Sequence, residues 1–93
     1  MFRSGLALIC GAPQRALALL QQLMQERFGL QGTVSVLGMD EHGCMLYDLA
    51  VGDERLDGKA AFHIRDAVQA LDGSIKLKAK AARDMGKHNF YCK

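Results

Sequence analysis

The sequence contains no long apolar run, no internal repeat and few cysteines, and each absence argues against a class of protein. No stretch of the 93 residues approaches the ~18 to 20 apolar residues that a membrane-spanning helix needs, so we expect no membrane span. The three cysteines, Cys10, Cys44 and Cys92, form an odd and widely spaced set, unlike a disulfide framework. We therefore expect reduced thiols in a cytoplasmic protein.

The composition that is present is that of an ordinary globular chain. Apolar residues make up 49% of the sequence and charged residues 24%, which argues against wholesale disorder. This length predicts a single domain over residues 1–93, with a core at about 5–80 and a C-terminal tail at 81–93. The apolar stretch 5–10 that follows Arg3 is shorter than a secretory core of ~7 to 15 residues, so we do not expect secretion.

The first half of the chain predicts a buried strand followed by an amphipathic helix. Residues 6–10 are a continuous apolar run, which is typical of a strand buried on both faces. Pro13 suits a first helical turn, and Gly29 suits the residue that ends a helix, so we predict a helix over residues 13–28. The apolar face of that helix consists of Ala16, Leu17, Leu20, Leu23, Met24 and Phe28.

The second half predicts a hairpin, a second helix and a last strand. Strands 33–39 and 44–51 are joined by the polar connection 40–43, and 52–58 is a loop in which Asp57 can cap the next helix. The helix over residues 59–71 has an apolar stripe of Ala61, Ile64, Val68 and Leu71, with Phe62 beside it. Residues 74–80 alternate between Ile75, Leu77 and Ala79 on one side and Lys76, Lys78 and Lys80 on the other.

This order of elements predicts an α+β fold, the ferredoxin-like βαββαβ two-layer sandwich, with two helices on one face of a four-stranded antiparallel sheet. The right-handed crossover rule places the first and third strands in the centre and the second and fourth at the edges. The lysines of 74–80 suit an edge strand, where they discourage unwanted pairing.

A two-layer sandwich leaves one sheet face uncovered, and that face is a candidate binding surface. Strand 44–51 carries two side-chain sets. We expect the more apolar set to face the helices (Met45, Tyr47, Leu49 and Val51) and the other set to be exposed (Cys44, Leu46, Asp48 and Ala50). Leu46 and Asp48 are therefore candidate binding residues, although a scattered leucine on a solvated sheet is the alternative.

The charge is concentrated at the C-terminal end. Residues 1–73 carry six basic and nine acidic side chains, whereas residues 74–93 carry six basic side chains and one acid. The basic candidates for contact with phosphate or an acidic partner are Lys76, Lys78, Lys80, Arg83 and Lys87. Nucleic acid is possible but not favoured, because the two expected central strands carry only one aromatic residue, Tyr47, for stacking bases. A soluble edge strand and tail is the alternative.

The chemistry of a metal site or an enzyme is weakly represented. His42 and Cys44 lie in the hairpin, and His88 and Cys92 lie in the tail. We expect the hairpin and the end of the last strand to lie at the same end of the sheet, so these four could form a tetrahedral zinc site, but their spacing is unlike a two-cysteine knuckle. Exposed polar residues are the preferred interpretation. Because no acid–base pair falls in an expected cleft, we predict no enzyme and no cofactor.

Residues 6–10, the Gly11 to Pro13 loop, the leucine-rich helix and strand 33–39 resemble the opening of an ACT domain. Members of that family are small regulatory modules that often pair side by side and bind amino acids at the interface. The family typically has Pro-Gly at its ligand loop, where this chain has Pro13-Gln14. The resemblance covers about residues 5–80 and implies a small-molecule sensor.

We predict a non-catalytic binding module that regulates or inhibits a protein partner, or forms a homodimer, through the open sheet face and an edge strand. A nucleic-acid accessory protein and an ACT-like amino acid sensor are the alternatives.

Overall fold

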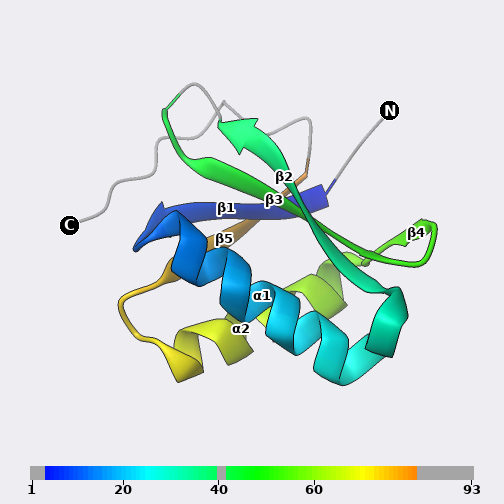
Figure 1. Cartoon of the computed structure of the whole chain (residues 1–93). Coiled ribbons are helices and arrows are strands. Elements are labelled where there is room, and N and C mark those ends of the chain that lie inside the picture. The colour runs from blue at the N-terminus through cyan, green and yellow to red at the C-terminus, as the bar shows by residue number, and fades with distance from the viewer. Residues whose placement is uncertain (1–3, 40–41, 82–93) are drawn as a thin grey trace.

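The computed structural model describes residues 4–39 and 42–81, which form an α+β fold of two α-helices and a five-stranded antiparallel sheet (Figure 1). The elements are β1 (Ser4–Cys10), α1 (Pro13–Phe28), the 3-10 turn η1 (Gly29–Gln31), β2 (Gly32–Met39), β3 (Met45–Val51), β4 (Glu54–Arg55), α2 (Gly58–Leu71) and β5 (Lys76–Ala81). Among these residues no helix combines the length and the apolar content needed to cross a membrane. The predicted tail, with Arg83, Lys87, His88 and Cys92, lies outside the described residues.

The sheet has the strand order β2-β3-β1-β5. This confirms that the first and third strands are central and that the second strand and the last strand are edges. The strand count differs from the prediction, because the expected loop contains β4, which pairs with β3 through Ala50↔Arg55 and Val51↔Glu54. Gly52 has a φ of 61°, a backbone conformation that residues with a Cβ atom rarely adopt. This conformation allows the chain to reverse between β3 and β4.

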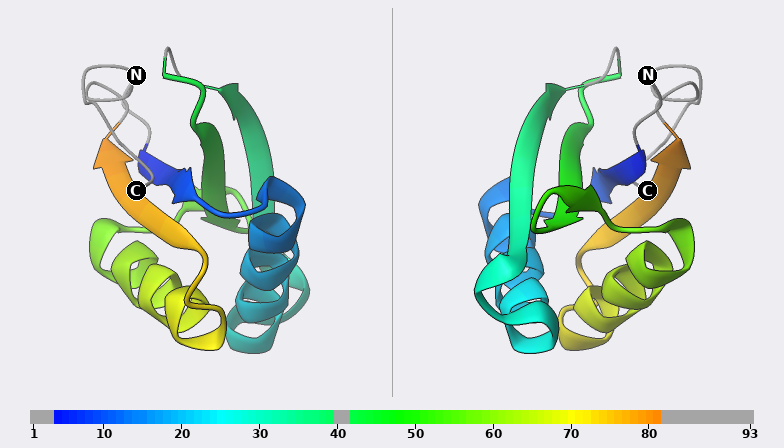
Figure 2. Two further views of the ribbon diagram at one scale, coloured as in Figure 1. Left: turned by 90° about the vertical axis from the view of Figure 1, so that its left-hand side faces the viewer. Right: turned by 90° about the vertical axis from the view of Figure 1, so that its right-hand side faces the viewer.

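Both helices lie on the same side of the sheet, as the two views of Figure 2 show. The core between the layers contains Tyr47 and Leu49 of β3, with Met45 and Val51 packed against it, so the prediction that this set faces the helices is confirmed. One expectation for α2 is wrong: Leu71, predicted on the apolar stripe, is 56% exposed. Phe62, predicted beside the stripe, is 45% exposed. Leu71 is the last residue of α2, and Phe62 lies beside the apolar stripe, under the guanidinium of Arg65 at 5.0 Å.

The predicted helix ends are confirmed. Pro13 begins α1, and Gly29 follows it with a φ of 66°. The side chain of Asp57 accepts a hydrogen bond from the backbone N–H of Ala60 at 2.9 Å, which satisfies one of the unpaired donors of the first turn of α2.

Gly32 fixes how closely α1 approaches β2. A Cβ atom at this position would lie 2.4 Å from the carbonyl oxygen of Met24, a backbone atom that cannot move without moving the helix. A glycine is therefore required where α1 crosses the start of the edge strand.

Tyr47 joins the two layers at the other end of α1. Its side chain is 1% exposed, and its hydroxyl donates a hydrogen bond to the carbonyl oxygen of Pro13 at 2.8 Å. Burial raises the pKa of Tyr47 above its ordinary value of 10.0, because the phenolate would lose its hydration.

Replacing Tyr47 by Phe should lower the free energy of unfolding by about 1 kcal/mol at pH 7, since the ring remains and only the hydrogen bond is lost. In the wild type, the unfolded tyrosine ionises near its ordinary pKa while the folded tyrosine stays protonated. The free energy of unfolding of the wild type therefore falls as the pH rises above 10.0. Tyr47→Phe has no phenol at this position, so its free energy of unfolding lacks this decrease. Urea denaturation at pH 7 and at higher pH should show the difference between the two proteins shrinking. A constant difference would contradict the burial of the phenol.

Candidate functional site

The sheet face opposite the helices is closed at its centre, so the expectation that it is exposed there is wrong. Leu46 and Cys44 are each 8% exposed and Ala7 is fully buried, and the three form a second apolar cluster. The register explains this contact, since Ala7 lies directly across from Leu46 in the β1–β3 pair. Leu46 is consequently a packed side chain, and its role in binding stays a prediction.

Asp48, the second candidate on this face, is 8% exposed and is paired with Arg55. The Arg55 Nε lies 3.1 Å from one carboxylate oxygen of Asp48 and 3.2 Å from the other. The tight turn at Gly52 folds β4 back along β3 and brings the guanidinium over the carboxylate. Asp48 therefore acts as a structural anchor for β4. Sequence reasoning missed Arg55 because it lies in the segment interpreted as a loop.

Replacing Asp48 by Asn, or Arg55 by Met, should lower the free energy of unfolding by about 2 kcal/mol, because a charged group then stays partly buried without its partner. The double variant should lose less than the sum of the two single variants. Urea denaturation measures all three free energies.

Arg65→Met is the matched control for this pair. Its side chain is 27% exposed against 28% for Arg55, but its partner Asp66 is 62% exposed. An exposed pair of this kind contributes little, so we expect a change under about 0.5 kcal/mol. Additive effects of Asp48→Asn and Arg55→Met would show that the pair does not couple β4 to β3.

The basic candidates are only partly described. Lys76 and Lys78 are exposed on β5, in register with Cys10 and Ala7 of β1. The side chain of Lys80 and the residues Arg83 and Lys87 lie outside what is described. Of the predicted basic cluster, the structure thus brings together two lysines on one edge strand.

The metal candidates do not form a site among the described residues. Residues 4–39 and 42–81 hold no group of three side chains suited to a metal ion, and His88 and Cys92 lie outside these ranges. The topological premise was also wrong. β5 ends at Ala81 opposite Ser4, whereas Cys10, at the other end of β1, pairs with Lys76. Since Ala7 pairs with Leu46, the hairpin lies at that other end.

His42 and Cys44 instead line a cavity of about 300 Å³ at the hairpin end of the sheet. The loop before α1 contributes Gly11 and Pro13, and β2 contributes Met39. The lining of the cavity combines apolar side chains with the imidazole of His42 and with polar backbone atoms.

Cys10 is disulfide-bonded, while Cys44 is a buried thiol. The expectation of reduced thiols is therefore wrong for Cys10. Disulfides persist mainly in oxidising compartments, so the predicted cytoplasmic location loses the observation on which it rested and stays a prediction.

Sequence reasoning predicted binding through an edge strand but did not say which one, and it named no residue of β2 as a candidate. The described residues expose six large apolar side chains, and four of them fall within residues 30–39: Leu30, Val36, Leu37 and Met39. Residues 32–39 contain no charged residue and no proline. Charges, proline and β-bulges are the usual devices that keep an edge strand from pairing. Of these three, β2 has one bulge, where its register with β3 shifts between Val36 and Gly38. The signal was present in the sequence as this uncharged run of eight residues.

The opposite edge, β5, is protected in two ways. First, Lys76 and Lys78 are exposed along this strand. Second, the side-chain oxygen of Gln69 in α2 accepts a hydrogen bond from the backbone N–H of Leu77 at 2.9 Å. The backbone N–H of Leu77 is therefore already hydrogen-bonded to Gln69 and is not available to an added strand. The two edges of the sheet differ in charge and in access to their backbone groups.

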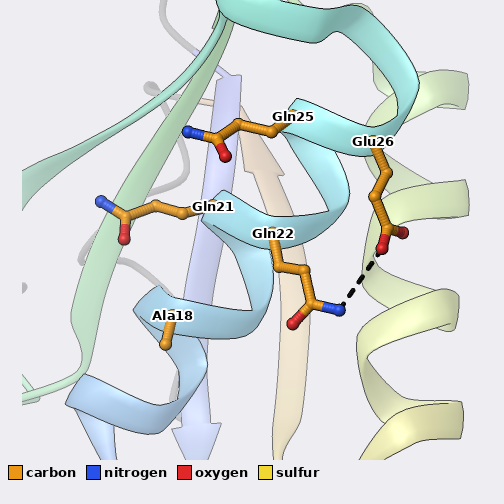
Figure 3. A pocket seen from close by; sticks show the side chains of 5 residues that line it. All are labelled: Ala18, Gln21, Gln22, Gln25 and Glu26. Carbon is orange, nitrogen blue, oxygen red and sulfur yellow. Dashed lines mark hydrogen bonds between the residues drawn. The ribbon is translucent and has the colours of Figure 1, made fainter.

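A hollow beside β2 is lined by the amide side chains of α1. Gln21 and Gln25 share it with Gly32, Thr33 and Val34 of the strand. Figure 3 shows Gln21 and Gln25 extending from one side of α1, while Gln22 points elsewhere and donates a hydrogen bond to Glu26 at 3.4 Å. The surface next to the edge strand is therefore polar but uncharged.

Comparison of this chain with protein-family models, with curated proteins and with solved structures finds no match.

Proposed function

We propose that this chain is a small non-catalytic module of the ferredoxin-like βαββαβ class, with β4 as an addition, and that it binds a protein partner through the edge strand β2. The observation that carries the proposal is the concentration of exposed apolar side chains on residues 30–39 in a strand without charge. An exposed patch of this kind is typical of a surface that a partner covers.

The mechanism is addition of a strand. A partner segment in extended conformation lies along β2 and exchanges backbone hydrogen bonds with it, which supply affinity. Side chains such as Val36 and Leu37 supply specificity, since they are 49% and 36% exposed. Binding at this edge would regulate or inhibit the partner by occupying one of its segments.

The two other functions have weaker support. The nucleic-acid function has Lys76 and Lys78, which are exposed, but neither β5 nor the neighbouring strand β1 contains an aromatic residue for stacking. The ACT-like sensor has the cavity between Gly11, Pro13 and His42. The described residues that line it include no carboxylate, ammonium or guanidinium group to pair with an amino acid's charged ends. A thermal-shift screen against amino acids tests the sensor directly.

Replacing Val36 by Lys should abolish partner capture, because the ammonium group would have to be desolvated in the added strand. The tagged chain is used as bait in its native source, and captured proteins are identified by mass spectrometry after nuclease treatment. We expect a set of proteins captured by the wild type and lost with Val36→Lys.

Leu71→Lys is the matched control, because Leu71 is 56% exposed and lies on α2, away from β2. It introduces the same charge and should leave capture unchanged, while circular dichroism confirms that both variants fold. Equal capture by wild type and Val36→Lys would overturn the proposal. Loss of capture with Lys76→Glu and Lys78→Glu, in place of Val36→Lys, would favour the nucleic-acid alternative.

A further inference from the structure

We propose that the partner at the β2 edge is a second copy of this chain, joined around a two-fold axis so that the sheet continues from one β2 into the other. The inference rests on the proposed function and names its occupant. It is argued from the charge of the strand, the side chains of α1 beside it, and the apolar residues at the two ends of β2.

The charge pattern of β2 permits self-pairing. In a two-fold antiparallel pair, residues near the axis lie opposite themselves, so any charged side chain there meets a like charge. Residues 32–39 carry none. The same operation on β5 would bring Lys76 and Lys78 of one copy against the lysines of the other, and Gln69 already occupies the N–H of Leu77.

The helix layer satisfies the same condition. A second copy at the β2 edge brings its own α1 beside the first, so that the side chains lining the hollow next to β2 face their equivalents. Those side chains include Gln21 and Gln25. An amide group both donates and accepts hydrogen bonds, so it can pair with an identical group. A carboxylate or an ammonium group cannot.

The ends of β2 carry the two most exposed large apolar side chains of the described residues. Leu30, in the turn before β2, is 97% exposed, and Met39, its last residue, is 63% exposed. Antiparallel pairing places the start of one strand beside the end of the other. One contact therefore covers both residues in both copies.

Sedimentation equilibrium of the untagged chain tests the inference. We expect a particle of twice the 10.2 kDa chain mass for the wild type, and a monomer for Val36→Lys. Amide hydrogen exchange in residues 32–39 should slow as the protein concentration rises, because the added strand protects the outward N–H groups.

Two substitutions at neighbouring positions of α1 distinguish a charge placed in the proposed interface from a charge added elsewhere on the same helix. Gln21→Lys places like charges beside the axis and should weaken self-association at least about tenfold. Gln22→Lys adds the same charge on the side where Glu26 can pair with it, and should leave self-association unchanged.

A wild type that stays monomeric would overturn the second copy as partner, and capture that depends on Val36 would then still support the proposed function. A dimer that persists in Val36→Lys and in Gln21→Lys would overturn the inference by placing the contact elsewhere. Capture unaffected by Val36→Lys, together with a monomeric wild type, would overturn both.

Discussion

An edge strand exposes backbone N–H and C=O groups that need hydrogen-bond partners. An open sheet such as this one has two edge strands, β2 and β5. In this molecule the two edges are treated differently. The β5 edge receives a side-chain acceptor from Gln69 and exposed lysines, so it is closed to pairing. The β2 edge has neither lysine nor proline and displays apolar side chains. This asymmetry decides where another chain can add, and it is why the proposed function lies at β2.

The sheet face opposite the helices supplies the complementary constraint. That face would be the natural docking surface of a two-layer fold, but its centre holds a cluster of Ala7, Cys44 and Leu46 and the pair Asp48–Arg55. An ion pair in this position is costly to separate, since the buried carboxylate of Asp48 would lose the counter-charge that Arg55 provides. While the centre of this face is buried, four of the six exposed large apolar side chains of the described residues lie within residues 30–39.

The sequence predicted most of the elements because their signals are local. The helix over residues 13–28 follows from its apolar period, from Pro13 and from Gly29, and the cap at Asp57 follows from residue type. The side assignment of Tyr47 and Leu49 follows from alternation. Alternation separates the two faces of a strand, however, and does not say what covers a face. The contact of Leu46 with Ala7 depends on the register of β1 and β3, which is a property of the folded sheet.

The candidate site was harder to predict for a related reason. The turn at Gly52 folds β4 back onto β3 and places Arg55 beside Asp48. A strand of two residues leaves almost no pattern in a sequence. The β2 edge did leave a pattern, an uncharged run of eight residues. Its meaning depends on β2 being an edge strand and on the protection of the other edge, and Gln69 protects that edge through a contact eight residues away in the chain.

Gly32 links the core to the proposed binding surface. The backbone of α1 lies so close to this residue that a Cβ atom would be 2.4 Å from the oxygen of Met24. Any larger residue would push the helix away from β2, and with it Gln21 and Gln25, which line the hollow next to the strand. The close packing that stabilises the helix–sheet layer therefore also sets the position of the amides that an added strand would meet. Gly32 thus determines both the packing of α1 on the sheet and the position of Gln21 and Gln25, because β2 and α1 are parts of a single close-packed contact.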